Sequence, residues 1–99
     1  MLVHTVFFRL KPGVTAALAA DFKKGVETLG AIKHVEKVYV GTPAKVPARP
    51  VTDQSFAVAL TVLCKDVAAH DAYQDDPIHH AFIAKYQDLW ARAQVYDAE

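Results

Sequence analysis

The stretch SFAVALTVL, from Ser55 to Leu63, carries apolar side chains on both of the faces that a β-strand would present. Successive side chains of a strand point to opposite faces, so alternate residues share a face. A strand of an antiparallel sheet with one wet face would alternate apolar and polar residues. This segment does not, and it therefore predicts a strand in a sheet that is covered on both sides. The two faces are Phe56, Val58, Leu60 and Val62, and Ala57, Ala59, Thr61 and Leu63.

Three further segments predict strands. Residues 2–10, LVHTVFFRL, are rich in β-branched and aromatic side chains and end at a Lys-Pro-Gly turn. Residues 34–41 and 92–97 are shorter candidates. Between the second and third strands, residues 42–53 hold three prolines and no helical pattern, which predicts a loop. A loop of this length is unusual in so small a chain, and such loops are often functional or mobile.

Helices are predicted before the second strand and after the third. Residues 15–29 begin with Thr15 as a possible N-cap and carry one apolar stripe at helical spacing. A short helix over residues 67–73 follows Asp66, and a second begins at Asp76-Pro77, with the aspartate as N-cap and the proline in the first turn. The stripe of the first helix is Leu18, Phe22, Val26 and Leu29.

The order β-α-β-β-α(α)-β predicts an α+β, ferredoxin-like fold: a four-stranded antiparallel sheet with helices on one face. We expect residues 1–99 to form one domain. Helices of one chain can cover only one face of the sheet, so the other must meet something else. A second copy of the same sheet is the simplest partner, which predicts a homodimer joined through the sheet faces. The uncovered face would hold Val3, Phe7, Ala57, Ala59 and Leu63.

Composition argues against several classes of function. The chain has 99 residues, with 11 basic and 11 acidic side chains and no basic stripe, so nucleic-acid binding is not expected. No apolar run approaches the ~18–20 residues of a membrane span. The N-terminal segment lacks the features of a signal peptide, so none is expected. Cys64 is the only cysteine, so no internal disulfide can form, and the cytoplasm is the expected compartment.

Two motifs and a strand end form a pattern along the chain. The first motif is the start H-x-V-x-F-x-L-K-P-G-V, residues 4–14. The second is Y-x-x-x-P-x-H-x-x-F, residues 73–82, and a Tyr96-Asp97 strand end follows later. In this pattern the chain resembles one known family, the stress-responsive dimeric α/β-barrel (Dabb) domains, over nearly its whole length. The resemblance implies the same ferredoxin-like fold and a homodimeric barrel, in a family whose members mostly have no assigned activity.

One plant branch of that family, the olivetolic acid cyclase-type polyketide cyclases, implies a more specific chemistry. These enzymes close linear polyketides by intramolecular aldol condensation without a cofactor. Their catalytic base matches His79, and the residue that binds the substrate oxygen matches Tyr73. A histidine of their first strand, which lines the pocket, matches His4. The chain departs from the branch at Phe56, where the cyclases have a histidine, and at Val26, where they have a tyrosine. These departures predict a more apolar pocket.

Each catalytic candidate also has a structural reading. His79 lies in a first helical turn, where the helix dipole favours neutral imidazole and nearby Asp75 and Asp76 oppose it. It could be a general base, or it could hold the helix in place through a hydrogen bond to a strand. His4 could orient it or be a hydrogen-bonded core histidine. Tyr73 could hold a developing oxyanion or simply pack in the core.

No metal site is expected from local spacing. His80 is about 100° around the helix from His79 and is expected at the surface, and a two-histidine metal pair more often has a spacing of four. His34 and His70 are expected to be solvated. No phosphate loop, dinucleotide motif or metal-ligand cluster is present, so neither a metal ion nor another cofactor is expected. The expected walls of an apolar pocket are Phe8, Val26, Phe56, Phe82 and Trp90.

Two functions of different classes follow. The first is a dimeric protein that binds a small apolar or carbonyl-containing ligand, with or without cofactor-free acid–base chemistry by His79 and Tyr73. The second is a non-catalytic structural or stress-related dimer with a filled interior. A cofactor-free monooxygenase-like relative is a third, supported only by the shared architecture.

Overall fold

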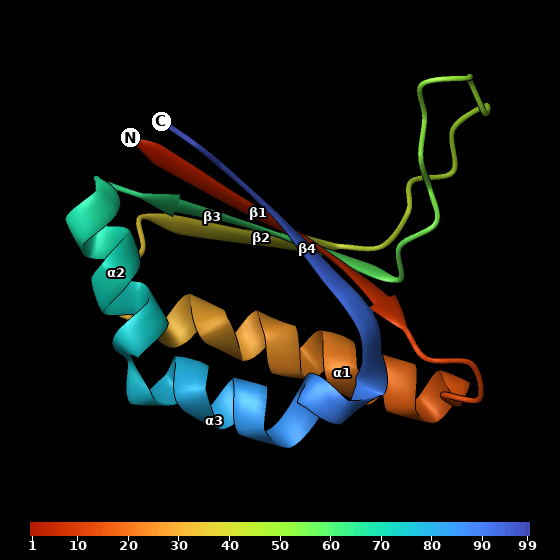
Figure 1. Ribbon diagram of the computed structural model, residues 1–99, viewed down its shortest axis with the longest axis horizontal. Coiled ribbons are helices and arrows are strands. Elements are labelled where there is room, and N and C mark those ends of the chain that lie inside the picture. The colour runs from red at the N-terminus through yellow and green to blue at the C-terminus, as the bar shows by residue number, and fades with distance from the viewer.

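A computed structural model describes residues 1–99 as an antiparallel sheet with every helix on one of its faces (Figure 1). This is the ferredoxin-like arrangement that the element order predicts, and that prediction is confirmed. The strands are β1 (Leu2–Leu10), β2 (Lys37–Gly41), β3 (Val58–Cys64) and β4 (Trp90–Ala98). The helices are α1 (Ala16–Glu27), α2 (Val67–Asp75) and α3 (Pro77–Tyr86), with short 3₁₀ turns η1 (Thr28–Ala31) and η2 (Gln87–Leu89).

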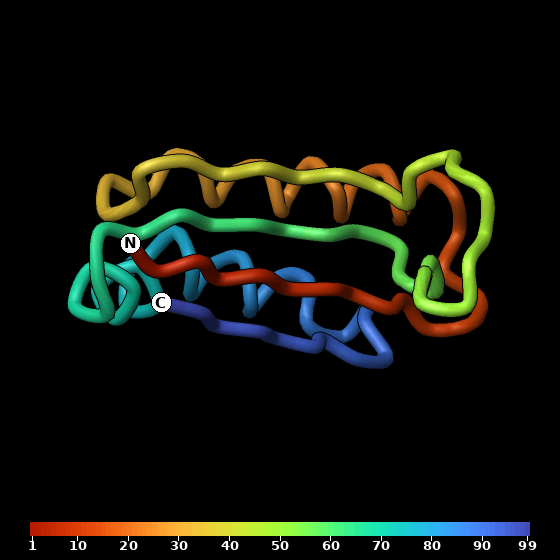
Figure 2. The backbone as a smooth tube through the Cα atoms, turned by 90° about the horizontal axis from the view of Figure 1, so that it is seen from above, coloured from red at the N-terminus to blue at the C-terminus, as the bar shows by residue number.

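The sheet has the order β2-β3-β1-β4, and all neighbouring strands run antiparallel. Figure 2 shows these four strands side by side, with both chain termini at the end of the sheet where α2 lies. Val6 of the central strand β1 pairs with Leu60 of β3 and Val95 of β4. The same register sets His4 opposite Asp97, so the first and last strands bring together residues from the two ends of the chain.

Side-chain caps begin each helix at the predicted residue. Thr15 Oγ1 accepts a hydrogen bond from Leu18 N at 3.1 Å. Asp66 Oδ1 accepts from Ala69 N at 2.8 Å, and Asp76 Oδ1 accepts from Ile78 N at 2.9 Å. The first-turn N–H groups of a helix have no partner within the helix, so these caps satisfy donors that would otherwise be unpaired. Pro77 fits the first turn of α3 because a donor is not needed there.

The core lies between the helices and the even-numbered residues of β1 and β3. The two-residue alternation is visible in both strands, where every second side chain is buried. Phe22, Val26 and Leu29 of the first helical segment are fully buried against this face. Leu18 is 45% exposed, so its expected place in the stripe is wrong; it lies in the first turn of α1.

Phe56 does not lie on the face expected for it. The third strand begins at Val58, and the chain bends at Ala57, whose N–H donates to the carbonyl of Phe8 at 2.8 Å. The Phe56 ring packs on Phe7, with the ring centroids 5.1 Å apart. Phe7 belongs to the sheet face without helices. The expectation that Phe56 shares a face with Val58 is therefore wrong, because the alternation stops where the strand stops.

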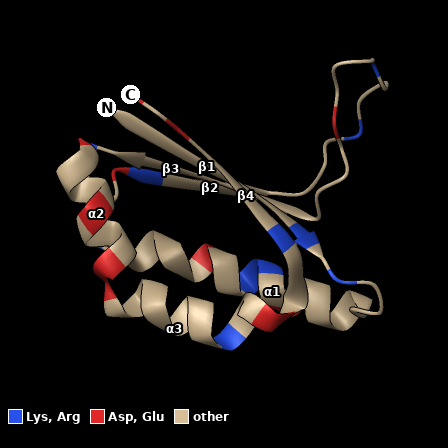
Figure 3. Ribbon diagram, in the orientation of Figure 1, with Lys and Arg blue, Asp and Glu red and all other residues tan.

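Charged residues are scattered along the ribbon, and no run of one sign crosses the molecule (Figure 3). None of the helices combines the length and the apolar character that crossing a bilayer requires. The sheet face opposite the helices is not strongly polar. Tyr39 and Tyr96 are exposed there, and Val3, Phe7 and Leu63 are only partly covered by neighbouring side chains.

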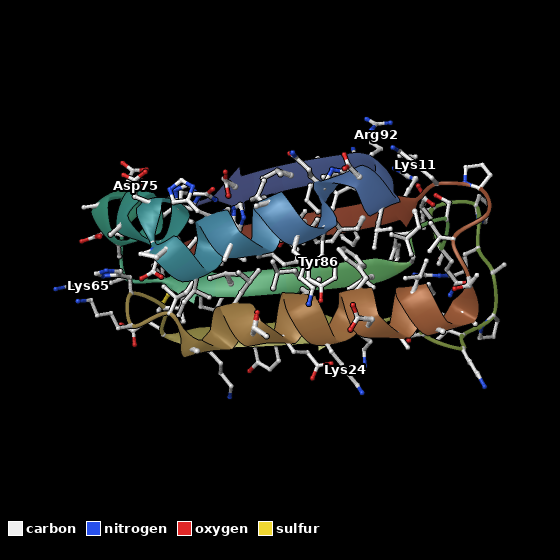
Figure 4. The ribbon with its side chains drawn as sticks, turned by 90° about the horizontal axis from the view of Figure 1, so that it is seen from below. Lys11, Lys24, Lys65, Asp75, Tyr86 and Arg92 are labelled. Carbon is white, nitrogen blue, oxygen red and sulfur yellow. The ribbon has the colours of Figure 1, made fainter.

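Helices α1 and α3 meet at a glycine. Tyr86, labelled in Figure 4, extends from α3 toward α1. Its hydroxyl donates to the Asp21 carboxylate at 3.1 Å. A Cβ atom on Gly25 would lie 2.5 Å from Tyr86 Cζ and 2.8 Å from Tyr86 Oη, closer than any real contact. The absence of a side chain at Gly25 therefore lets the two helices approach each other.

We expect Gly25→Ala to destabilise the protein by about 2 kcal/mol, because overpacking of this contact outweighs the helix propensity that alanine adds. In an exposed helix the same change would stabilise by about 1 kcal/mol. Urea denaturation gives the free energy of unfolding. Gly30→Ala is the matched control, since its Cβ would meet only Val38 Cβ at 3.9 Å. A Gly25→Ala protein as stable as the wild type would contradict the close helix contact.

Candidate functional site

A cavity of about 130 Å³ lies between the helix-covered face of the sheet and helices α2 and α3. Thirteen residues line it, and ten of them are hydrophobic. The polar groups include His4 from β1, Tyr73 from the last turn of α2 and His79 from the first turn of α3. The structure therefore brings all three catalytic candidates to one apolar cavity, from three separate elements.

Tyr73 is fully buried, and its hydroxyl has no hydrogen-bond partner in the protein. Its ring stands between the two histidines, with centroid distances of 5.9 Å to His4 and 5.0 Å to His79. Burial raises the pKa of the Tyr73 phenol well above its usual value, so the hydroxyl stays protonated and can donate. An unpaired buried hydroxyl costs ~1–3 kcal/mol, and native structures rarely leave one without a reason.

His79 is half-buried, and no protein group forms a hydrogen bond with its ring. Burial lowers the pKa of His79, and the neighbouring histidines His4, His80 and His70 lower it further, while Asp76 acts in the opposite direction. The sequence leaves open whether the helix dipole or the acidic residues Asp75 and Asp76 dominate. In the structure the largest effect on the pKa of His79 is burial, which lowers it and outweighs Asp76. The ring is neutral at pH 7 and can accept a proton.

His4 is held by a carboxylate. Its Nδ1 lies 2.5 Å from Asp97 Oδ1, the residue that the register of β1 and β4 sets opposite it. An ionised carboxylate can only accept a hydrogen bond, so the proton of neutral His4 is on Nδ1. The other nitrogen, Nε2, is then an acceptor without a protein partner.

The apolar walls only partly match those expected. Phe8, Phe82 and Trp90 line the cavity. Their rings pack closely, with centroid distances of 5.2 Å from Phe8 to Trp90 and 5.9 Å from Phe82 to Trp90. Val26 is fully buried in the core and does not line the cavity, and Phe56 lies on the opposite face of the sheet.

His70 is closer to this site than the sequence indicates. We expected a solvated histidine, but it is half-buried in α2, with its ring centroid 5.0 Å from that of His4. The spacing of three residues between His70 and Tyr73 could have indicated this, since residues three apart share a helix face. His80 is exposed, as expected. The groups able to hold a metal ion are His4, His70 and Asp97, whose ligating atoms lie within 4.8 Å of one another.

The lowered pKa of His79 predicts how stability depends on pH. In the unfolded chain this histidine titrates near pH 6.5, and in the folded protein it titrates at lower pH. Between these two values the unfolded chain binds more protons, so stability falls as the pH drops below about 6.5. We expect His79→Gln to lose less stability than the wild type between pH 7.5 and 5.5 in urea denaturation.

His80→Gln is the control for this comparison, because His80 is the adjacent exposed histidine on the same helix. It should keep the pH dependence of the wild type. If His79→Gln and the wild type lose the same stability on acidification, His79 is not held neutral by burial.

Solved structures of other proteins share this fold. A Dabb family protein from Mesorhizobium loti is 23% identical, with 99% of this chain and 94% of that chain covered and a TM-score of 0.78. A ferredoxin-like protein of unknown function from Thermobifida fusca, described as dimeric, is 19% identical, with 98% and 88% covered and a TM-score of 0.78. A hydroxynitrile lyase from Passiflora edulis is 17% identical, with 98% and 90% covered and a TM-score of 0.80.

At these identities the structural likeness establishes the fold and no more. Comparison with curated proteins gave no match. The family model described as the stress-responsive A/B barrel domain, Dabb, matches residues 2–99, which is all but the first residue of the chain. The chain belongs to the Dabb family of stress-responsive A/B barrel domains.

Proposed function

We propose that this protein binds a small, largely apolar carbonyl compound in the cavity beside Tyr73 and moves a proton at the carbon next to the carbonyl. The observation that carries the proposal is the fully buried Tyr73 hydroxyl, which has no protein partner and belongs to a residue of the cavity wall. A carbonyl oxygen in the cavity would accept this hydrogen bond and remove the cost of leaving it unmade.

His79 supplies the base. Its neutral ring takes a proton from the carbon next to the carbonyl, and the electron pair left behind moves onto the carbonyl oxygen. The Tyr73 O–H stabilises the negative charge that grows on that oxygen, in a cavity lined mostly by hydrophobic residues, where such an interaction is strong. The protonated His79 then returns a proton to carbon, or the enolate adds to a second carbonyl, as in an aldol step.

His4 has a supporting role in this scheme. Asp97 fixes its ring, and its free Nε2 can accept a hydrogen bond from the ligand or from a water molecule in the cavity. Held in this way, His4 orients the ligand. A carboxylate that holds a histidine ring also stabilises the imidazolium, so His4 is the second candidate for the base.

The size of the cavity limits the ligand. Its volume of about 130 Å³ is slightly below the ~150 Å³ of an engineered cavity that binds benzene. A small aliphatic ketone or aldehyde fits within it, whereas a long linear polyketide would extend out of it into solvent. We therefore propose chemistry of the cyclase type, proton transfer and carbon–carbon bond formation next to a carbonyl, on a substrate smaller than those of the plant cyclases. The hydroxynitrile lyase of Passiflora edulis shows that this fold can carry an enzyme.

The alternative is a non-catalytic structural dimer with a filled interior. It accounts for the His4–Asp97 hydrogen bond, which ties the first strand to the last. It gives no reason for the open cavity or for the unpaired hydroxyl of Tyr73. The two proposals also predict different effects on stability and on ligand binding when the Tyr73 hydroxyl is removed.

We expect the wild-type protein to catalyse exchange of the α-hydrogens of a small ketone, such as cyclopentanone, for deuterium in D₂O at pH 7.5. Nuclear magnetic resonance of the ketone follows the reaction. His79→Ala should reduce the rate by about 100-fold, as expected for loss of a general base. Tyr73→Phe should also reduce it, and His80→Ala should leave it unchanged. Loss of exchange in His4→Ala, with normal exchange in His79→Ala, would assign the base to His4 instead.

Tyr73→Phe should keep or increase the free energy of unfolding, because it removes a buried hydroxyl that has no partner. Thermal or urea denaturation measures this. The structural alternative predicts the reverse, a loss of stability without any effect on ligand binding or exchange.

The sheet face without helices supports a homodimer. Apolar side chains such as Phe7 and Leu63 lie on this face. No helix or strand of the same chain packs over it (Figure 1), although the Phe56 ring lies against Phe7. A structural relative from Thermobifida fusca is described as dimeric. We propose that two sheets pack face to face, with the two-fold symmetry most common for such pairs.

Light scattering should therefore give twice the mass of one chain at micromolar concentration. Leu63→Glu should shift the protein to a monomer, since it would place an unpaired carboxylate in the proposed interface. Glu36→Gln, a change at an exposed residue before β2, is the control and should stay dimeric. A monomeric wild-type protein would rule out the proposed interface.

A further inference from the structure

Three polar side chains meet where β1 begins and β4 ends, beside helix α2. Figures 1 and 2 show both chain termini at this end of the sheet, next to α2. His4 Nδ1 lies 2.5 Å from Asp97 Oδ1, and His70 Nε2 lies 4.0 Å from the same oxygen. The ligating atoms of all three residues lie within 4.8 Å of one another. They come from three elements, so no local sequence motif reveals the cluster.

We propose that His4, His70 and Asp97 bind one divalent transition-metal cation of the Zn²⁺ class. Two imidazole nitrogens and one carboxylate form a set that zinc and similar metals prefer. Three protein ligands leave one position for water or another small ligand, as in exchangeable or catalytic sites. Neither Tyr73 nor His79 is a ligand, but His4 is shared with the proposed acid–base site. A cation on His4 Nδ1 would leave the ring proton on Nε2, which would then donate a hydrogen bond into the cavity instead of accepting one.

The surroundings of His70 match those of a metal ligand. Its Nδ1 lies 3.3 Å from the carboxylate oxygen Oδ1 of Asp71, the next residue in α2. A carboxylate at this position accepts the Nδ1 proton and leaves Nε2 unprotonated, 4.0 Å from Asp97 Oδ1 and 3.4 Å from the side-chain nitrogen of Gln74, which a metal ion would displace. Metal-binding histidines usually donate their second ring N–H to a carboxylate or carbonyl in this way.

The charge of the cluster also favours a cation. The only basic side chains within 4.0 Å of the Asp71 and Asp97 carboxylates are histidines, which carry a charge only when protonated, and no lysine or arginine lies that close. Figure 3 shows acidic positions on α2 and near the C-terminal end of β4. A divalent ion would neutralise the two carboxylates without requiring either histidine to be protonated.

A small movement would complete the geometry. Ligand atoms ~2.1 Å from one tetrahedral ion lie ~3.4 Å apart, so His4 Nδ1 and Asp97 must separate by about 1 Å and His70 must approach. The Asp97 side chain is 41% exposed and lies next to the last residue of β4. It can move, and it leaves the cluster open to ions from solution. His4 is buried and gives the site a fixed position.

The test uses tag-free full-length protein, treated with EDTA and then freed of it. Titration calorimetry with Zn²⁺ should give one ion per chain at micromolar affinity. Co²⁺ should give the visible absorption of a site with nitrogen and oxygen ligands. His70→Ala and Asp97→Asn should each weaken Zn²⁺ binding at least tenfold, while their circular dichroism spectra show that they remain folded.

His79→Ala and His80→Ala are the matched controls, and both should bind Zn²⁺ as the wild type does. Excess Zn²⁺ should raise the melting temperature of the wild type and of these controls, but not that of His70→Ala. The proposal is overturned if the wild type binds no Zn²⁺, or if His70→Ala and Asp97→Asn bind it unchanged. The deuterium-exchange assay, run in EDTA, reports on the acid–base site separately.

Discussion

The sheet carries apolar side chains on both faces, while the helices of one chain can cover only one of them. This constraint determines the arrangement of the rest of the molecule. On the covered face, the even-numbered residues of β1 and β3 meet α1 and α3 and form the core. His4 is one of these even-numbered residues, so the same alternation that buries Val6 and Phe8 carries a histidine inside. On the other face, it leaves apolar side chains that no helix covers, and there we propose that a second sheet packs.

The proposed site depends on how helix α3 begins. The Asp76 side chain caps the helix, and Pro77 occupies its first turn, where no N–H donor is needed. This start fixes the direction of α3 and places His79 5.0 Å from the Tyr73 ring, measured between ring centroids. Burial then keeps His79 neutral and Tyr73 protonated. A base and a hydrogen-bond donor are thus set side by side by local backbone chemistry and by burial.

Much of this organisation could be predicted from the sequence because it is local. Alternation in β1 and β3, and the caps Thr15, Asp66 and Asp76, depend on residues a few positions apart. Phe56 could not be placed, because the alternation ends at a bend that pairing with β1 decides. The partner of His4 could not be found either, since the register of β1 and β4 joins residues 4 and 97. The three-residue spacing of His70 and Tyr73 already indicates a shared helix face, but the approach of His70 to His4 and Asp97 depends on contacts between elements.

The central claim is that the unpaired Tyr73 hydroxyl marks a binding site for a carbonyl oxygen. A crystal structure grown with a small aliphatic ketone tests this most directly. The account predicts the ketone in the cavity beside His79, with its oxygen about 2.7 Å from Tyr73 Oη, the usual length of such a hydrogen bond. An empty cavity closed by repacked side chains, with the Tyr73 hydroxyl bonded to another protein group, would contradict it.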